Sequence, residues 1–228
     1  MSHTLTGTID RVTVAAVILA QTAEEALVPI DGVARVRHLA DAAWSGGAMP
    51  VVVVAADPDG ALAAALGGSM AVLVPALASD GGPAGQIVRG IEAAMTRVAE
   101  TTAALVWPVQ MAWVDAGTVT ALIEAHPRDP GAVLRPAWQG EPGWPALVPV
   151  TQLGTLRRVA PRLAGDAVLA HLASAGVASL ALELGDPGVR YDTATARQAL
   201  PVFEGPERPL SGHPPEWGAS VAPPTPDS

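Results

Sequence analysis

Short runs of aliphatic, mostly β-branched residues recur along the chain, and alanine-rich stretches with apolar residues at helical spacing separate them. A strand that is buried on both faces of a parallel sheet has a continuous apolar run, so we interpret the runs as such strands. The predicted strands are Val12 to Ala20, Pro50 to Ala56, Ala71 to Val74, Ala103 to Trp107, Gly131 to Pro136 and Val177 to Leu184. The predicted helices are Val33 to Trp44, Pro58 to Leu66, Pro83 to Val98, Thr118 to Ala125 and Asp166 to Ala175.

Strands and helices that alternate in this order predict a three-layer α/β/α domain with a mostly parallel sheet. We expect this domain to cover residues 1–204. The Gly- and Pro-rich segment from Pro136 to Pro149 is expected to be a loop or hairpin that projects from the sheet. Asp192 or Thr193 is expected to cap a helix from Ala194 to Leu200. Residues 205–228 are rich in proline and poor in aliphatic residues, which predicts a disordered tail.

Composition narrows the function classes. Of the 228 residues, 50% are hydrophobic and 4% aromatic, and 22 acidic against 13 basic residues give a net charge of −9. This balance argues against a nucleic-acid partner. The longest uninterrupted apolar run, Val14 to Ala20, is much shorter than the roughly 20 residues of a membrane span. We therefore expect a cytoplasmic protein without a membrane partner. The absence of cysteine excludes disulfides and thiol nucleophiles.

In an open α/β sheet, ligands bind beyond the carboxyl ends of the strands, so the segments that follow the runs are the candidate sites. The segment after the first run has no glycine before Gly32 and carries Glu24 and Glu25. A loop that holds phosphate needs glycines and usually a cation, so this segment would repel phosphate. The glutamate pair could serve a metal or acid/base site, or could be a solvated turn.

Other strand ends offer further candidates. Gly81, Gly82 and Gly85 precede or begin a helix that carries Arg89, and they could receive a ribose or phosphate. Alternatively, Asp80 or Ser79 caps that helix and the glycines serve the turn.

The first polar side chain after the fourth run is Gln110, an amide where a metal-dependent transferase needs a carboxylate. Asp115 follows and is more typical of an N-cap than of a metal ligand. Gly143 and Trp144 could form a stacking platform for a base, or Trp144 could cover the core. Asp192 is a candidate helix cap or metal ligand.

Well-known catalytic motifs are missing from the sequence. There is no nucleophile elbow and no Gly-x-Gly-x-x-Gly after the first run, and the chain contains no lysine for a P-loop. Its histidines are scattered along the chain and lack a triad or metal-ligand spacing. These absences argue against a triad hydrolase, a dinucleotide dehydrogenase and a P-loop enzyme.

Taken in order, segments from about Val12 to Pro201 resemble the nucleotidyltransferases that attach GMP or CMP to molybdopterin, whose sheet is like that of nucleotide-diphospho-sugar transferases (GT-A-like). The resemblance is carried by Val14 to Ala20, Leu27 to Gly32, Arg37 to Gly47, Leu105 to Val109, Val114 with Asp115, Thr118 to His126, Pro130 to Pro136, Gly143 to Pro145, Asp186 to Gly188 and Asp192 with Thr193. Together with the strand-end residues considered above, the candidate nucleotide-binding positions are Gln21, Gly81, Gly82, Gly85, Arg89, Gly143 and Trp144.

The sequence departs from the family pattern at the positions that bind phosphate and metal in the family. Gln21 to Ala26 replace the family's glycine-rich phosphate loop and lysine, and Gln110 stands where the family has its magnesium aspartate. Arg190 replaces the first acid of the late Asp-x-Asp-Thr motif, so that only Asp192 remains, and Trp144 replaces the histidine of Gly-His-Pro. These changes predict a pseudoenzyme that needs no cofactor.

Three functions remain open. The first is a non-catalytic protein that binds CTP, GTP or molybdopterin weakly, or docks on a partner protein. The second is an active transferase that moves CMP or GMP to molybdopterin, with a Mg²⁺ site rebuilt from Glu24, Glu25, Asp80, Asp115 or Asp192. The third is a structural subunit that binds partners through proline-rich segments such as Pro206 to Pro215.

Overall fold

A computed structural model describes residues 13–206. The strands are β1 (Thr13–Leu19), β2 (Pro29–Ile30), β3 (Val33–Ala34), β4 (Val51–Ala55), β5 (Ala71–Pro75), β6 (Thr101–Pro108), β7 (Val133–Trp138), β8 (Glu141–Pro142), β9 (Ala146–Pro149) and β10 (Ser179–Glu183). The helices are α1 (Ala23–Leu27), α2 (Arg35–Ser45), α3 (Ala61–Ala65), α4 (Pro83–Arg97), α5 (Ala116–Ala125), α6 (Leu153–Leu156) and α7 (Asp166–Ser174).

The main sheet has the strand order β10-β7-β9-β6-β1-β4-β5, and β8 pairs with β7. All neighbours along this order are parallel except β9, which runs antiparallel to both β6 and β7. The central strands are continuous apolar runs, and every residue of β4 is buried. The structure therefore confirms the predicted α/β class with a mostly parallel sheet.

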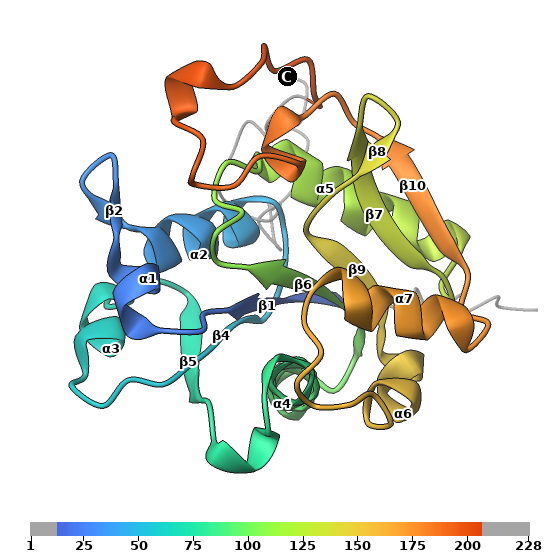
Figure 1. The fold of residues 1–228 in the computed structure, drawn as a ribbon, viewed down its shortest axis with the longest axis horizontal. Helices are drawn as coiled ribbons and strands as arrows, with labels where there is room; N and C mark the ends of the chain where they lie inside the picture. Colours follow the sequence, from blue (N-terminus) through green and yellow to red (C-terminus); the bar gives the residue numbers. More distant parts are fainter. Residues whose placement is uncertain (1–12, 207–228) are drawn as a thin grey trace, which may run out of the picture.

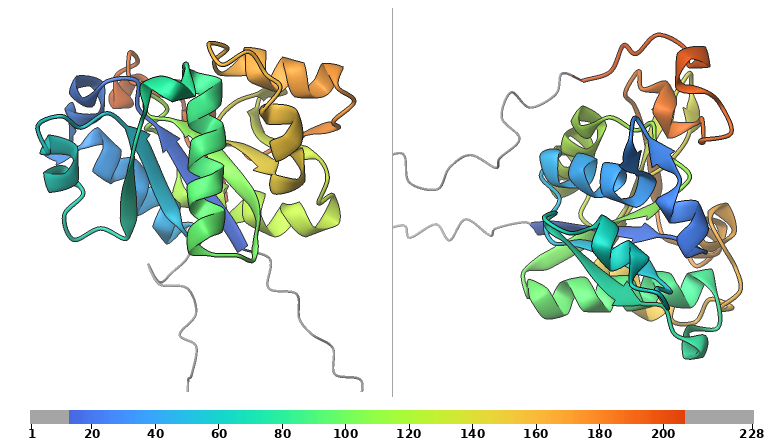
Figure 2. Two further views of the ribbon diagram at one scale, coloured as in Figure 1. Left: turned by 90° about the horizontal axis from the view of Figure 1, so that it is seen from below. Right: turned by 90° about the vertical axis from the view of Figure 1, so that its left-hand side faces the viewer.

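Helices cover both faces of this sheet (Figure 1). In that view α2 and α5 lie above it, and α4 lies below it with α6 and α7 beside it; Figure 2 shows the same layers from two other sides. Gly90 allows α4 to pack closely on the sheet, because a Cβ at this position would meet the side chains of Val17 in β1 and Val54 in β4. Among the described residues no helix has the length and apolarity needed to cross a bilayer.

Several elements differ from the sequence-based expectations. The segment from Pro136 to Pro149 does form a hairpin through β8, but its last residues become β9 and fill the space between β6 and β7. The expected helix from Ala194 to Leu200 is a single 3-10 turn over Arg197–Ala199. The predicted tail lies outside the described residues apart from Gly205 and Pro206.

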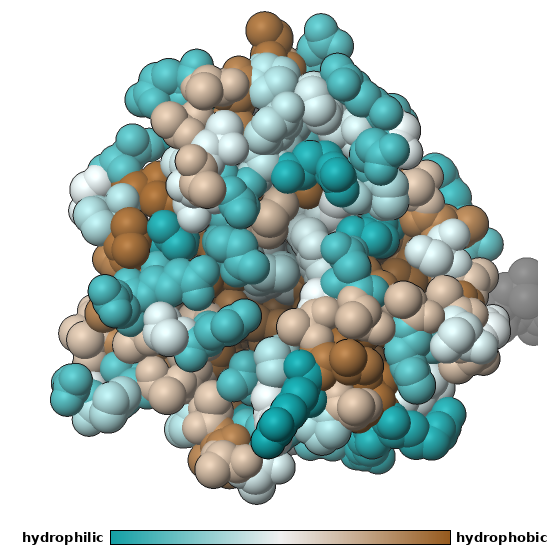
Figure 3. Space-filling model, viewed as in Figure 1, coloured by the Kyte–Doolittle hydropathy of each residue, from teal (hydrophilic) through white to brown (hydrophobic). Residues whose placement is uncertain are grey.

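The order of the strands reverses at β1. The chain goes from β1 to β4 and β5 on one side, and then returns to place β6 on the other side of β1. The carboxyl ends of the parallel strands face the viewer in Figure 1, and the surface is hollowed near the centre of the same view (Figure 3). Open α/β sheets bind ligands at such a point. The candidate site is therefore expected at this edge of the sheet.

Candidate functional site

Two of the sequence-predicted residues meet at the carboxyl ends of the central strands. Gln21 follows β1, Gln110 follows β6, and both line a cavity of 180 Å³. The pairing of β1 with β6 sets this arrangement, since Leu19 is in register with Pro108. The other lining residues are Leu19, Pro83, Gln86, Pro108, Ala164 and Gly165. We refer to this space as the amide cavity, after its three glutamines.

The glutamate pair after β1 belongs to a short helix rather than to an open turn. Thr22 caps α1 by accepting a hydrogen bond from Glu25 N at 3.1 Å, and Glu24 and Glu25 occupy the first helical turn. Acidic side chains at this end stabilise a helix by interacting with its dipole. Glu25 Oε1 also lies 4.0 Å from Arg35 Nη1. The pair therefore has a structural explanation.

The glycines before α4 serve packing and do not line the amide cavity. A Cβ on Gly82 would lie 2.8 Å from Pro161 O, and Ala84 N donates to the same oxygen at 3.0 Å. Gly81 contacts the Pro161 side chain in the same way, while a Cβ on Gly85 would collide with Asp80 O. Gly85 lines a separate cavity of 210 Å³ together with Asp80 and Arg89, so a ligand-binding role for these glycines stays a prediction.

Arg89 and Asp80 bind each other. The guanidinium donates to the Asp80 carboxylate at 2.7 Å, which lowers the pKa of Asp80. Asp80 also accepts from Leu77 N at 2.8 Å, while Gly82, the N-cap residue of α4, offers no side-chain cap. The prediction that Ser79 or Asp80 caps this helix is therefore wrong. Arg89 is turned toward its own ion pair and does not line the amide cavity.

Trp144 covers the core and is not an exposed platform. It is 9% exposed, and the Arg135 guanidinium lies 5.4 Å from its ring centroid. Arg135 Nε donates to Gly143 O at 3.0 Å, which connects this segment to β7. The structure therefore favours the alternative in which Trp144 covers the core over the one in which it stacks on a base.

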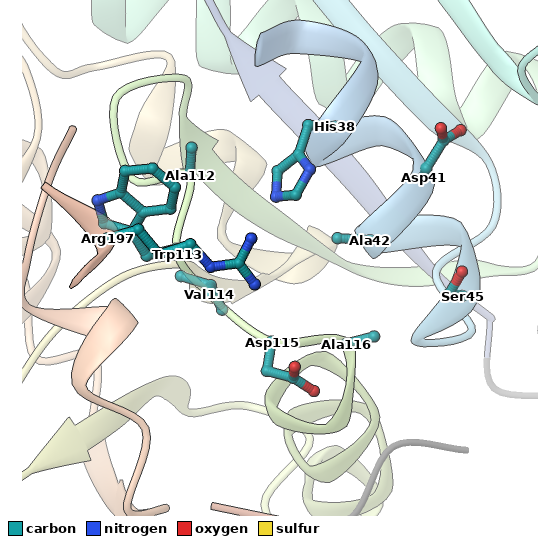
Figure 4. A pocket seen from close by; sticks show the side chains of 10 residues that line it. All are labelled: His38, Asp41, Ala42, Ser45, Ala112, Trp113, Val114, Asp115, Ala116 and Arg197. Carbon is teal, nitrogen blue, oxygen red and sulfur yellow. The ribbon is translucent and has the colours of Figure 1, made fainter. Parts of the chain in front are cut away.

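A second cavity, of 320 Å³, lies on the other side of the loop after β6, between α2, the start of α5 and the C-terminal segment (Figure 4). Asp115 caps α5 by accepting from Gly117 N at 2.9 Å, as predicted. The Arg197 side chain reaches into this cavity and binds Asp31 at 2.7 Å. Burial, with a further contribution from Arg197, lowers the pKa of His38 on the opposite wall. The cavity therefore presents charges of both signs.

Backbone hydrogen bonds fix the position of the late motif, Arg190 to Thr193. Thr193 N donates to Gln110 O at 3.0 Å, and Trp113 Nε1 donates to Asp192 O at 3.0 Å. The Asp192 carboxylate accepts from Ala194 N at 2.9 Å, so it caps a turn. Arg190 donates to Pro142 O at 2.8 Å and lies beside the β8 hairpin.

Asp186 connects the loop after β6 to the segment that precedes the late motif. Its buried carboxylate accepts from Gly188 N at 2.8 Å, Asp115 N at 3.0 Å and Thr118 Oγ1 at 2.7 Å. Burial raises its pKa, although these three donors act in the opposite direction. The sequence marked Asp186 as part of a family-like segment, but its role as a buried anchor became visible only in the fold.

The donor set does not suit a divalent metal. Gln110 offers an amide oxygen, and Asp80, Asp115 and Asp192 hold hydrogen bonds in separate places. Within residues 13–206, no three His, Cys, Asp or Glu side chains come together as metal ligands. Mg²⁺ is usually held by one or two carboxylates together with substrate phosphates, and Gln110 supplies no carboxylate at this strand end. We therefore assign no catalytic step to a metal.

Three polar residues of the two cavities illustrate what sequence reasoning missed. Gln86 lines the amide cavity from α4, and His38 and Arg197 line the second cavity. None of them belongs to a motif or follows a strand directly. Only the placement of α4 and of the C-terminal segment brings them to these sites.

Comparison with known proteins connects this geometry to one family. A family model described as a MobA-like NTP transferase domain matches residues 20–186. No curated protein matches the chain.

Several solved structures share the fold. A Mycobacterium tuberculosis protein in complex with manganese has a TM-score of 0.56 and 22% identity, covering 75% of this chain and 89% of that one. A nucleotidyl transferase from Methanothermobacter has a TM-score of 0.61 and 20% identity over 75% and 87% of the two chains. A 4-diphosphocytidyl-2C-methyl-D-erythritol synthase has a TM-score of 0.61 and 17% identity over 83% and 96%. At these identities the likeness establishes the fold and nothing about the reaction.

Proposed function

Because the chain belongs to the family of MobA-like NTP transferase domains, we propose that it is a non-catalytic member, which uses the scaffold to bind a nucleotide or a pterin weakly or to dock on a partner protein. The observation that carries this proposal is the composition of the amide cavity. Its lining residues within the described part of the chain are all uncharged.

Nucleotidyl transfer depends on groups that stabilise the charge that develops on phosphate, and on a metal ion that neutralises it. Removing one such donor typically lowers the rate by about 10²–10³. Here the segment after β1 is a helix with Glu24 and Glu25 in its first turn, and Gln110 stands at the end of β6. A triphosphate would therefore meet negative charge on α1 and an amide at the strand end.

Pyrophosphate release tests this proposal. The protein is incubated with α-labelled CTP or GTP, magnesium and molybdopterin, and an active nucleotidyltransferase assayed in parallel shows that the conditions support turnover. We expect no pyrophosphate above a control without protein. Steady turnover would overturn the proposal.

The alternative is an active transferase that moves CMP or GMP to molybdopterin with a rebuilt metal site. The family match supports this alternative, and one structural neighbour is a manganese complex. The rebuilt site would have to recruit carboxylates such as Glu24 and Asp115, which lie on α1 and at the start of α5. Tightening of nucleotide binding by magnesium would favour this alternative.

Docking without a ligand is the third possibility. A ligand at 100 times its dissociation constant stabilises a protein by about 2.7 kcal/mol. Thermal-shift titration with CTP, GTP and magnesium therefore separates a nucleotide-binding protein from one that only docks on partners. The segment from Pro206 to Pro215, which sequence reasoning assigned to docking, lies outside the described residues except for Pro206.

A further inference from the structure

The amide cavity combines three glutamines from three different elements. Gln21 follows β1, Gln86 is the fourth residue of α4, and Gln110 follows β6. Gln21 is exposed, while Gln86 and Gln110 are half-buried. The remaining wall is formed by Leu, Pro, Ala and Gly residues. Segments far apart in the sequence thus bring three glutamines to the lining of one cavity.

The chemistry of these side chains restricts what the cavity can bind. A primary amide presents two donors and an acceptor side by side, so it pairs with a flat group that carries an acceptor next to a donor. Nucleobases have such edges, and ribose hydroxyls also pair with amides. The 180 Å³ of space is below the range of about 300–1,000 Å³ that is typical of sites for whole drug-sized ligands. It suits a base or a sugar rather than an entire nucleotide.

No cationic side chain of the described residues lines the amide cavity. Arg89 is bound to Asp80, and Arg35 lies near Glu25. Arg162 is exposed and lies close to Gly82, but it is not part of the lining. Bound phosphates would therefore extend away from the cavity without a dedicated cation.

We propose that the amide cavity binds the uncharged part of a nucleoside, its base or ribose, and that neither phosphate nor Mg²⁺ contributes to this binding. The inference rests on the proposed function and specifies its ligand class. The residues at the strand ends that would hold triphosphate and metal in a transferase are replaced by groups that recognise a neutral heterocycle or sugar.

Calorimetric titration of the full chain tests this inference. Cytidine, CMP and CTP, and the matching guanosine series, are compared with and without magnesium. We expect dissociation constants within about threefold of one another in each series, unchanged by magnesium. A triphosphate that binds more than about tenfold tighter than its nucleoside, or only with magnesium, would overturn the inference while nucleotide binding survived. If no compound of either series binds, nucleotide binding itself fails, and the inference with it.

Variants locate the binding. Gln21→Leu, Gln86→Leu and Gln110→Leu should each weaken nucleoside binding, and a lost bidentate pair corresponds to roughly 5- to 150-fold. Gln198→Leu is the matched control, because Gln198 is exposed in the C-terminal segment. Since Gln21 is also exposed, Gln21→Leu tests the cavity without endangering the fold. Unchanged binding in all three cavity variants would overturn the inference.

Arg162→Ala tests whether phosphate finds a cation at the rim. We expect equal binding of CTP to this variant and to the original chain. A selective loss of CTP binding, with cytidine binding retained, would show that phosphate is recognised and would contradict the inference.

Discussion

Gly90 lies where α4 crosses the sheet, and its replacement by alanine should destabilise the protein. The new methyl group would collide with Val17 Cγ1 and approach Val54 Cγ2 to 3.0 Å. Both valines are fully buried in central strands, so neither can move aside. Overpacking of a core typically costs about 1–3 kcal/mol, and a collision with two immobile side chains belongs at about 2–3 kcal/mol of this range, while alanine gains up to about 1 kcal/mol over glycine in a helix. We expect a net loss of about 1–2 kcal/mol.

Thermal unfolding measures this effect. For a protein of this size, 1 kcal/mol corresponds to about 2–4 °C, so Gly90→Ala should lower Tm by about 2–8 °C. Gly154→Ala is the matched control, because Gly154 lies in α6 and a Cβ there has no neighbour within 4 Å among the described residues. This variant should keep or raise Tm. Equal Tm values for the two variants would refute the close packing of α4 on β1 and β4.

Further predictions concern buried groups and the C-terminal segment. Burial lowers the pKa of His126 and, with Arg197, that of His38, so the unfolded chain binds more protons below about pH 6.5 and stability falls as the pH drops. The urea midpoint should therefore be lower at about pH 5.5 than at about pH 7.5, and His126→Leu should reduce this difference; an unchanged pH profile would refute it. Trp144→Ala should cost about 3–5 kcal/mol in urea unfolding, because the ring is buried beneath Arg135, and a loss below 1 kcal/mol would contradict this placement. Arg197→Ala should cost at most about 1 kcal/mol in the same assay, since its ion pair with Asp31 is exposed, and a larger loss would indicate a stronger anchor.

The central strands could be predicted from the sequence because they are continuous apolar runs. β4 is four valines followed by alanine, and such a segment has no alternative to burial on both faces. β9 is not recognisable as a strand from the sequence, because Ala146–Pro149 follows Pro145, ends in a proline and is too short for a periodic pattern. Its position between β6 and β7 depends on antiparallel pairing with strands that are distant in the sequence.

The candidate site was predictable only where a strand end fixes the position of a residue. Gln21 and Gln110 follow β1 and β6, and the parallel register of these strands brings them together. Gln86 could not be found in this way, because it lies inside α4 and reaches the cavity through packing of that helix. Gly82 looked like a ligand-binding glycine, but its closeness to Pro161 is a tertiary contact that no local pattern encodes.

The central claim is that this crevice accepts a neutral group and lacks the means to hold a metal-bound triphosphate. The most direct measurement is a crystal structure of the protein soaked with CTP and Mg²⁺. We predict density for the base or ribose beside Gln21 and Gln110, with phosphates directed into solvent. A magnesium ion bound by several carboxylates of the chain, with the triphosphate against α1, would contradict the account.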